Sequence, residues 1–429
     1  ARIGLLRTYR AQAVVFQIDY AELIVRNQTI PHEILQRDPN SAQAKNALAG
    51  ADFSLHFPTG SGKAVRLWGE ALETAPNDPW ILSAYAYYLE WNDRPQEAIK
   101  FLQRALEVDP FHPFVLANAA RLGDLKHAQT LREKVPENTA GWAVAGEAYL
   151  RGGDLARSLE YFRIAEEKSP RDPEFPAFIA MIYLTAGLLD EAEAAVRRAE
   201  AAGLTSPVSV AARIGLTYRQ EGLETAGEMA LAALRSALPA RQFSPTIINN
   251  LALQYALHTK MPERFIEAYA MSFEAPGMGG AGNFRQRPVT SSADYRLLEW
   301  VLPALHAAGE SGTAARILSE MTAFFNNNAS DRLRYHETPY RLQLFSGDVE
   351  GALDTLEELL DAGRGGAIPS WGTNLSELRW WLEFDGILAE PLKNSPRYSE
   401  ILDKRQAHMD QQRQAILAVI NNEAEAAPP

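Results

Sequence analysis

The sequence of 429 residues contains no cysteine. This absence excludes disulfides, cysteine-ligated zinc, iron–sulfur clusters and thiol catalysis. It does not separate the cytoplasm from the periplasm, because a cysteine-free chain tolerates both. Basic residues are also few, with 42 Lys and Arg against 54 Asp and Glu, which gives a net charge of −12. Nucleic acids and anionic membranes need a basic footprint, so we expect neither as the main partner.

Long hydrophobic runs are missing as well. No stretch of about 20 uncharged apolar residues occurs, so no membrane-spanning helix is expected. Three arginines ahead of an apolar stretch in residues 1–25 faintly resemble a signal sequence, but an amphipathic first helix is the simpler interpretation. The bacterial cytoplasm, the periplasm, and membrane association through a partner or a missing N-terminal segment all stay open.

Motifs for catalysis and metal binding are scarce. No two of the eight histidines lie four residues apart, and there is no H-E-x-x-H pair to bind a metal. No G-x-S-x-G nucleophile elbow occurs either. We therefore expect no catalytic residue, no metal, no cofactor and no enzymatic activity.

One segment, Pro58–Ala64, resembles a phosphate-binding loop. Such a loop needs the pattern G-x4-G-K-[S/T] between a strand and a helix. Phe57 stands where the first glycine is required, and Ala64 stands where the metal-binding hydroxyl is required. A turn between two helices is therefore the favoured interpretation of this segment.

A repeat dominates the chain. One set of positions recurs at intervals of 34 residues, as Ala64, Trp68, Ala71 and Pro76, then Ala98, Leu102, Ala105 and Pro110, and later Ser158, Phe162, Ala165 and Pro170. A second set, with Trp142, Ala145, Gly146 and Tyr149 as an example, precedes it in each unit. Spacings of three and four place these residues on one helical face. Each unit is therefore predicted to be two amphipathic helices, the second of which ends at the proline.

The run from Trp142 to Pro170 resembles a tetratricopeptide repeat almost position for position. This resemblance implies an all-α fold, a right-handed α-solenoid of about nine helical hairpins, in which each pair buries its apolar face against its neighbours. The expected parts are an N-terminal helical segment (1–45), regular repeats (46–276), a Gly-rich loop (277–292), divergent repeats (293–380), C-terminal capping helices (381–420) and a frayed tail (421–429).

The segments Leu382–Leu388 and Asn394–Leu402 resemble the C-terminal ends of tetratricopeptide regions in bacterial membrane-anchored regulators. Those regulators carry a nucleotide cyclase, a protein kinase or a winged-helix domain. The residues expected to cap the last repeat are Ile387, Leu388, Tyr398, Ile401 and Leu402. The polar segment Asp403–Arg413 that follows is expected to face water.

In this family the first helix of each unit lines a concave groove, which implies a partner site. The candidate groove residues are Trp80, Ser83, Tyr87, Phe114, Asn118, Arg121, Glu147, Met181, Arg219, Asn249 and Asn250. Asn118 and Asn250 stand where chaperone-binding members have part of a carboxylate clamp, but the lysines of that clamp are absent. A helical or extended peptide segment therefore suits this groove better than an acidic C-terminus.

Two functional hypotheses follow. The leading one is a non-catalytic interaction scaffold or sensor that binds a peptide or protein segment in the groove, within a larger bacterial regulator or membrane-associated complex. The alternative is a permanent structural subunit of a multiprotein complex that binds through convex and loop surfaces. Its candidate contact patch is Trp371, Trp380 and Trp381, beside Phe384. Packing inside the last repeats is the competing interpretation of that cluster.

Overall fold

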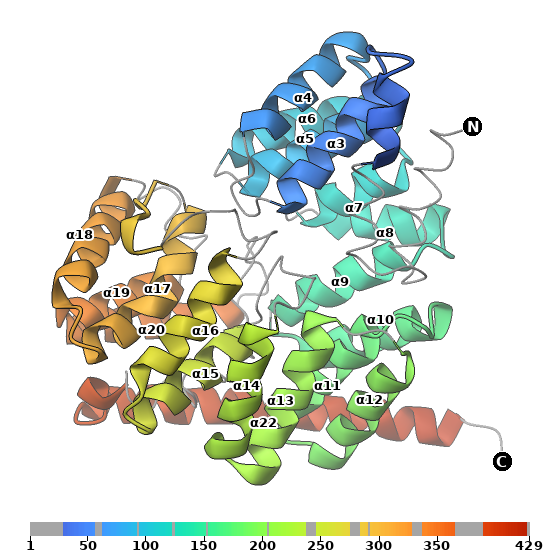
Figure 1. Cartoon of the computed structure of the whole chain (residues 1–429). Helices are drawn as coiled ribbons and strands as arrows, with labels where there is room; N and C mark the ends of the chain where they lie inside the picture. Colours follow the sequence, from blue (N-terminus) through green and yellow to red (C-terminus); the bar gives the residue numbers. More distant parts are fainter. Residues whose placement is uncertain are drawn as a thin grey trace. The chain divides into compact units, whose positions relative to one another are not determined.

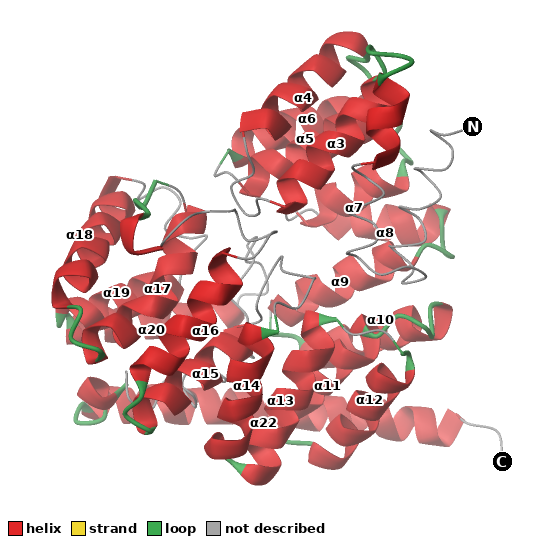
Figure 2. Cartoon of the chain, in the orientation of Figure 1, coloured by secondary structure: helices red, strands yellow, loops and turns green. Residues whose placement is uncertain are grey.

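The computed structural model describes residues 29–55, 62–91, 94–121, 125–151, 153–203, 206–236, 246–274, 284–290, 292–327, 337–364 and 389–426. Every regular element within these ranges is a helix (Figures 1 and 2). The fold class is therefore the predicted one, an all-α solenoid of helical hairpins.

Within the described ranges, the helices from α3 to α20 form nine successive pairs. The pairs are α3 (Ala42–Leu55) with α4 (Gly62–Thr74), α5 (Pro79–Trp91) with α6 (Pro95–Val108), α7 (Pro113–Arg121) with α8 (Leu125–Lys134), α9 (Thr139–Arg151) with α10 (Leu155–Lys168), α11 (Glu174–Ala186) with α12 (Leu189–Ala201), α13 (Pro207–Glu221) with α14 (Leu223–Arg235), α15 (Thr246–His258) with α16 (Pro262–Glu274), α17 (Ser292–Ala307) with α18 (Ser311–Asn327), and α19 (Glu337–Ser346) with α20 (Val349–Arg364). The short helix η1 (Phe284–Gln286) precedes α17, and η3 (Glu390–Leu392) precedes the last helix, α22 (Pro396–Ala426).

The chain divides into two compact units. Unit 1 comprises residues 1–141, 233–244 and 267–295, and unit 2 comprises residues 142–232, 245–266 and 296–429. Unit 1 contains the hairpins from α3 to α8, and unit 2 contains α10 to α13, α15, α18 to α20 and α22.

The repeated positions form the interior of the hairpins. Trp68 is 2% exposed, and its indole Nε1–H donates to Asn46 Oδ1 over 2.8 Å. In unit 2, a Cβ at Gly146 would come within 3.1 Å of Phe162 Cε2, so the glycine lets α9 and α10 approach closely. The Ser158 hydroxyl donates to the Gly146 carbonyl over 2.8 Å and closes the same contact. The small and large residues of the repeat thus serve the packing roles that their spacing indicates.

Short polar side chains set the start of several first helices. Asp78 Oδ1 accepts the backbone N–H groups of Trp80 and Ile81 at 3.0 and 3.1 Å. Asn138 and Asp172, which are 34 residues apart, each accept the N–H two residues further on at 2.9 Å. These bonds satisfy N–H groups that have no partner within the helix, and they fix where the next first helix begins.

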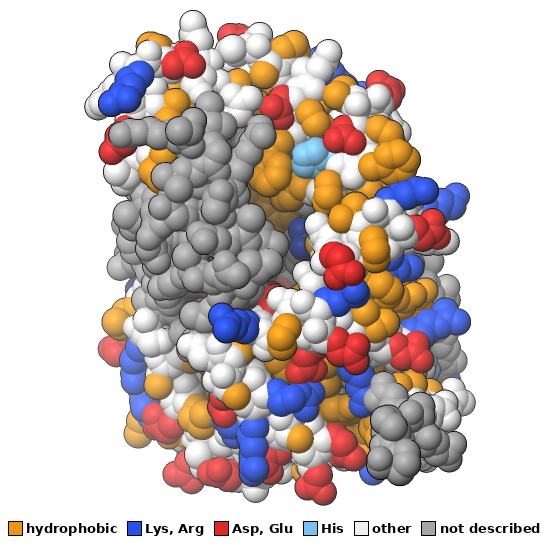
Figure 3. Space-filling model, turned by 90° about the vertical axis from the view of Figure 1, so that its right-hand side faces the viewer, with side chains coloured by type: hydrophobic (Ala, Val, Ile, Leu, Met, Phe, Trp, Pro, Cys, Tyr) orange, Lys and Arg blue, Asp and Glu red, His pale blue; other side chains and the backbone are white. Residues whose placement is uncertain are grey.

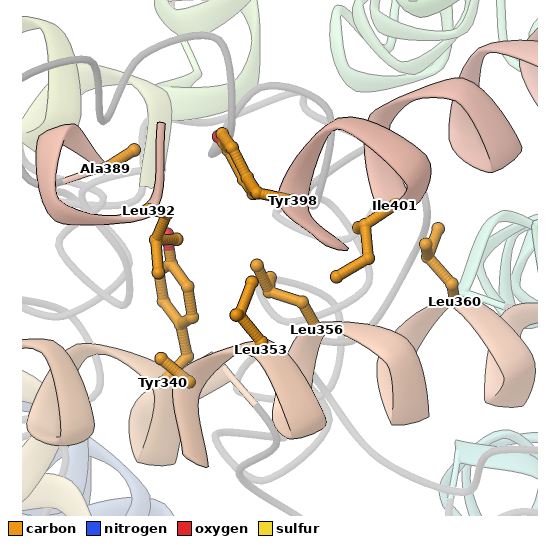
Figure 4. Packing of buried hydrophobic residues seen from close by; sticks show 9 residues of the cluster. Tyr340, Leu353, Leu356, Leu360, Ala389, Leu392, Tyr398 and Ile401 are labelled. Carbon is orange, nitrogen blue, oxygen red and sulfur yellow. The ribbon is translucent and has the colours of Figure 1, made fainter. Parts of the chain in front are cut away.

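The last repeat is capped as predicted. Tyr398 and Ile401 of α22 enter a buried cluster with side chains of α19, α20 and η3 (Figure 4). The cluster consists of Tyr340, Ala352, Leu353, Leu356, Leu360, Ala389, Leu392, Tyr398 and Ile401, with Leu402 packed against it. The other two predicted capping residues, Ile387 and Leu388, lie outside the described residues.

The structure differs from two expectations about the end of the chain. The helix α22 continues to Ala426, into the segment expected to fray, because residues 421–426 contain good helix formers and neither glycine nor proline. The segment Asp403–Arg413 does not face water on all sides, since Arg405 and Met409 are 5% and 2% exposed. In unit 2, α22 packs against α20, α10 and α11 (Figure 1).

Candidate partner-binding surface

Unit 1 brings together six of the predicted groove residues. Its first helices α5 and α7 pack against each other, and α3 packs beside α5. Along α5 lie Trp80, Ser83 and Tyr87, and along α7 lie Phe114, Asn118 and Arg121. Spacings of three, four and seven place each set on one side of its helix. We call these six residues the α5–α7 face.

The aromatic part of the α5–α7 face is a stacked pair. The rings of Trp80 and Phe114 lie 4.7 Å apart at 14°, and His112 meets Trp80 edge-on at 5.8 Å. Tyr87 contacts Phe53 of α3 edge-on at 6.2 Å. Trp80, Phe114 and Tyr87 are only partly buried, so they present rigid aromatic surface on a packed support.

The polar part is a chain of three side chains. Asn118 Nδ2 donates to Ser83 Oγ over 2.9 Å and to the Ser83 carbonyl over 3.4 Å. Asn118 Oδ1 in turn accepts from Arg121 Nη1 over 3.4 Å. Ser83 and Asn118 are 0% and 3% exposed, whereas Arg121 is only partly buried. The two buried residues therefore hold the guanidinium in place, and Arg121 is the one member of this chain of three that is not fully buried.

The tyrosine behind this face stays neutral. Burial, together with the neighbouring Tyr85, raises the pKa of the Tyr88 hydroxyl above its ordinary value, against the opposing charge of Arg94.

The other predicted groove residues lie in unit 2 and are spread over four helices. Glu147, Met181 and Arg219 are partly exposed on α9, α11 and α13. Asn249 and Asn250 of α15 are 5% and 1% exposed, and Asn250 Oδ1 accepts from Gln254 Nε2 over 2.9 Å. A binding role for these five residues stays a prediction.

Several other candidates fall outside the described residues. These are Trp371, Trp380 and Trp381 with Phe384, most of the Gly-rich loop, and residues 58–61 of the phosphate-loop-like segment. Gly62 and Lys63 open α4, whose Ala64 is a buried repeat position. The described residues contain no group of three or more side chains suited to a metal ion. In the same ranges, no helix has the length and apolar character needed to cross a bilayer.

Two surface features were missed from the sequence. Val108 and Phe111, at the turn between α6 and α7, are 48% and 51% exposed. The apolar pair around Asp109-Pro110 is the signal that could have indicated this patch. The second feature is the docking of α22 onto α10 and α11.

On the face shown in Figure 3, the described acidic and basic side chains are interspersed, with no continuous basic area.

Comparison with known families finds one match. A family model described as tetratricopeptide repeat matches residues 125–173 and 143–207. These stretches hold α8 to α12, where the 34-residue pattern is clearest. Residues 125–207 carry tetratricopeptide repeats. Comparison with curated proteins gave no match.

Solved structures that resemble the chain include three repeat assemblies of low identity. The APC/C hetero-tetramer Cut9–Hcn1 is 13% identical, with a TM-score of 0.46 over 92% of this chain and 68% of that one. Human IFIT1, as a dimer with PPP-AAAA, is 15% identical, with a TM-score of 0.42 over 94% and 95%. Pseudomonas aeruginosa pilF is 20% identical, with a TM-score of 0.29 over 56% and 94%. Likenesses this low carry no argument about function.

Proposed function

We propose that this chain is a non-catalytic protein-interaction scaffold that binds a peptide or protein segment on the α5–α7 face. Tetratricopeptide repeats are typical of such scaffolds, which supports the general class. The observation that carries the proposal is the juxtaposition, on two adjacent first helices, of the Trp80–Phe114 stack and an arginine held through Asn118 and Ser83. Partly exposed aromatics and arginine on rigid supports are the residue types that dominate binding energy at interfaces.

The chemistry of the face indicates the kind of segment it suits. The stacked rings offer a platform for an apolar or aromatic side chain. The guanidinium of Arg121 carries N–H donors that suit a carbonyl or carboxylate oxygen. A segment that carries an apolar side chain next to an oxygen acceptor can contact both the stacked rings and the guanidinium. The resemblance at the C-terminal end supports a setting in a larger bacterial regulator or membrane-associated complex.

The test uses partners recovered with the full chain from its native source. The double variant Tyr87→Ala, Arg121→Ala should weaken binding of an isolated partner by about 10- to 100-fold, the effect of removing one interface hot spot or more. Calorimetry measures the affinity, and circular dichroism checks that the helices remain. Gln103→Ala with Arg104→Ala is the matched control, because both residues are exposed in unit 1, outside the α5–α7 face and away from Val108 and Phe111. Undiminished affinity of the first variant would refute the assignment.

The second candidate function is a permanent subunit that binds through its outer surfaces. The exposed Val108 and Phe111 favour it, because two large apolar side chains lie together at a turn rather than on a first helix. Val108→Glu with Phe111→Glu should then abolish recovery of stoichiometric partners, while Tyr87→Ala with Arg121→Ala leaves it intact. The reverse result favours the α5–α7 face.

A further inference from the structure

The C-terminal helix α22 is held unevenly along its length. Its first part, residues 396–405, is anchored in the cluster of Figure 4 through Tyr398 and Ile401. The Arg397 guanidinium adds hydrogen bonds to three carboxylates of α20, those of Glu350, Asp354 and Glu357. We call this part the base. It completes the last repeat whatever the rest of the helix does.

The remainder of α22, residues 406–426, is called the arm. Among arm residues with a described environment, only Met409 and Ile416 are buried, at 2% and 0% exposure. They lie seven residues apart and therefore on one side of the helix. Gln412, between them on that side, accepts the backbone N–H of Leu155 at 2.9 Å through its Oε1. Residues on the opposite side, such as Gln411, Gln414 and Ala418, are exposed.

The arm docks where two hairpins turn. Leu155 is the first residue of α10, and its N–H is one of the donors that a helix cannot satisfy internally. Gly187, at φ +72°, ends α11, and a Cβ there would lie 3.5 Å from Arg413 Nη1. The Leu155 N–H needs an acceptor from outside its own helix, and Gly187 has no side chain. Both features allow a second helix to approach closely. The contacts of the arm here are the Gln412–Leu155 hydrogen bond and the approach of Arg413 to Gly187, and Met409 and Ile416 are the side chains that the arm buries.

We propose that this surface of unit 2, formed by the start of α10 and the end of α11, is a binding site for an amphipathic helix. The arm occupies it in the free chain. A partner helix with apolar side chains at positions i and i+7 and an acceptor at i+3 displaces the arm. Displacement leaves the last repeat intact, because the base is anchored separately. The site shares no residue with the α5–α7 face, so the two binding proposals can be tested independently.

The experiment measures binding of a labelled synthetic peptide, residues 403–426 of this chain, to three full-length proteins. These are the wild type, the variant Met409→Glu with Ile416→Glu, and the control Gln411→Glu with Ala418→Glu. The control adds the same charges with the same spacing on the exposed side of the arm. Release of the arm should raise peptide affinity by about 10- to 100-fold over the wild type. In the wild type the peptide binds only those molecules in which the arm is undocked, so the apparent affinity is the intrinsic affinity multiplied by the fraction of undocked molecules. The control should bind like the wild type.

Two further measurements complete the test. In the wild type, hydrogen exchange should be at least about 10-fold faster in the arm than in the base, as expected for local opening of a sparsely held segment. Gln412→Ala removes only the bond to Leu155 and should raise peptide affinity by about 2- to 10-fold, even if the double variant fails to fold. Equal exchange in arm and base would make the arm a permanent part of the fold and overturn the proposal. Peptide affinity unchanged in both arm variants would overturn the helix site itself.

Discussion

Replacement of Gly227 by alanine tests the helix packing of unit 2 directly. This glycine lies within α14, and a Cβ there would stand 2.2 Å from Cβ and 2.4 Å from Cγ of Tyr255 on α15. An alanine in a helix interior gains about 0.5–1 kcal/mol over glycine. Overpacking costs about 1–3 kcal/mol, and here the upper end applies, because the clash involves a Cβ fixed to the backbone of α15. The expected net effect is a loss of about 1–2 kcal/mol.

The control for this prediction is Gly69→Ala in α4 of unit 1. A Cβ at Gly69 meets nothing within 4 Å, so only the helix-propensity gain of about 0.5–1 kcal/mol applies. The same chemical change should therefore stabilise at one position and destabilise at the other. Urea unfolding followed by circular dichroism, with both variants under identical conditions, measures the two midpoints. A Gly227→Ala midpoint at or above that of the wild type would refute the close approach of α14 and α15.

Three further predictions concern single side chains. Burial raises the pKa of Asp172 from 3.8 to about 8, so the folded chain holds this proton more tightly than the unfolded chain. Stability should fall as pH rises between about 4 and 8, and Asp172→Asn should flatten that part of the profile in urea titrations. Asn46→Ala should cost about 1–3 kcal/mol in thermal unfolding, because it leaves the Trp68 indole N–H buried and unpaired, whereas Asn40→Ala at an exposed turn should be silent. Arg397→Ala should lower the free energy of unfolding slightly at low salt and leave it unchanged in molar salt, because the ion pairs of Arg397 are partly solvent-exposed and are screened by salt.

Much of the fold could be predicted because the repeat period fixes which residues meet. Trp80 and Phe114, which stack, are 34 residues apart, and Ser83 and Asn118, which share a hydrogen bond, are 35 apart. A residue on one first helix therefore meets the residue one period later on the next. Sequence reasoning placed these four on a shared face but did not pair them, although the period already indicated the pairs.

Burial within that face could not be predicted in the same way. Family groove positions describe which side of a helix faces inward, but not whether a neighbouring side chain covers it. Ser83 and Asn118 are short and polar, and they satisfy each other once two helices stack. Arg121, at the end of the same network, keeps an exposed portion because it is long. Side-chain length thus separates the supporting residues from the one that can contact a ligand.

The path of α22 lies beyond any rule based on the period. The bond between Gln412 and Leu155 joins residues 257 apart in the sequence, with five whole hairpins between them in the chain. Residues 403–414 of α22 are mostly polar, and the apolar residues that follow, 415–420, form a continuous run rather than one spaced side of a helix. In a solenoid each repeat contacts only its neighbours, so unfolding can begin at either end. A helix anchored on α20 and docked on α10 and α11 links repeats that the period keeps apart. The element of unit 2 that is hardest to predict from the repeat period therefore joins distant repeats, and its release tests contacts of longer range than a change within one repeat does.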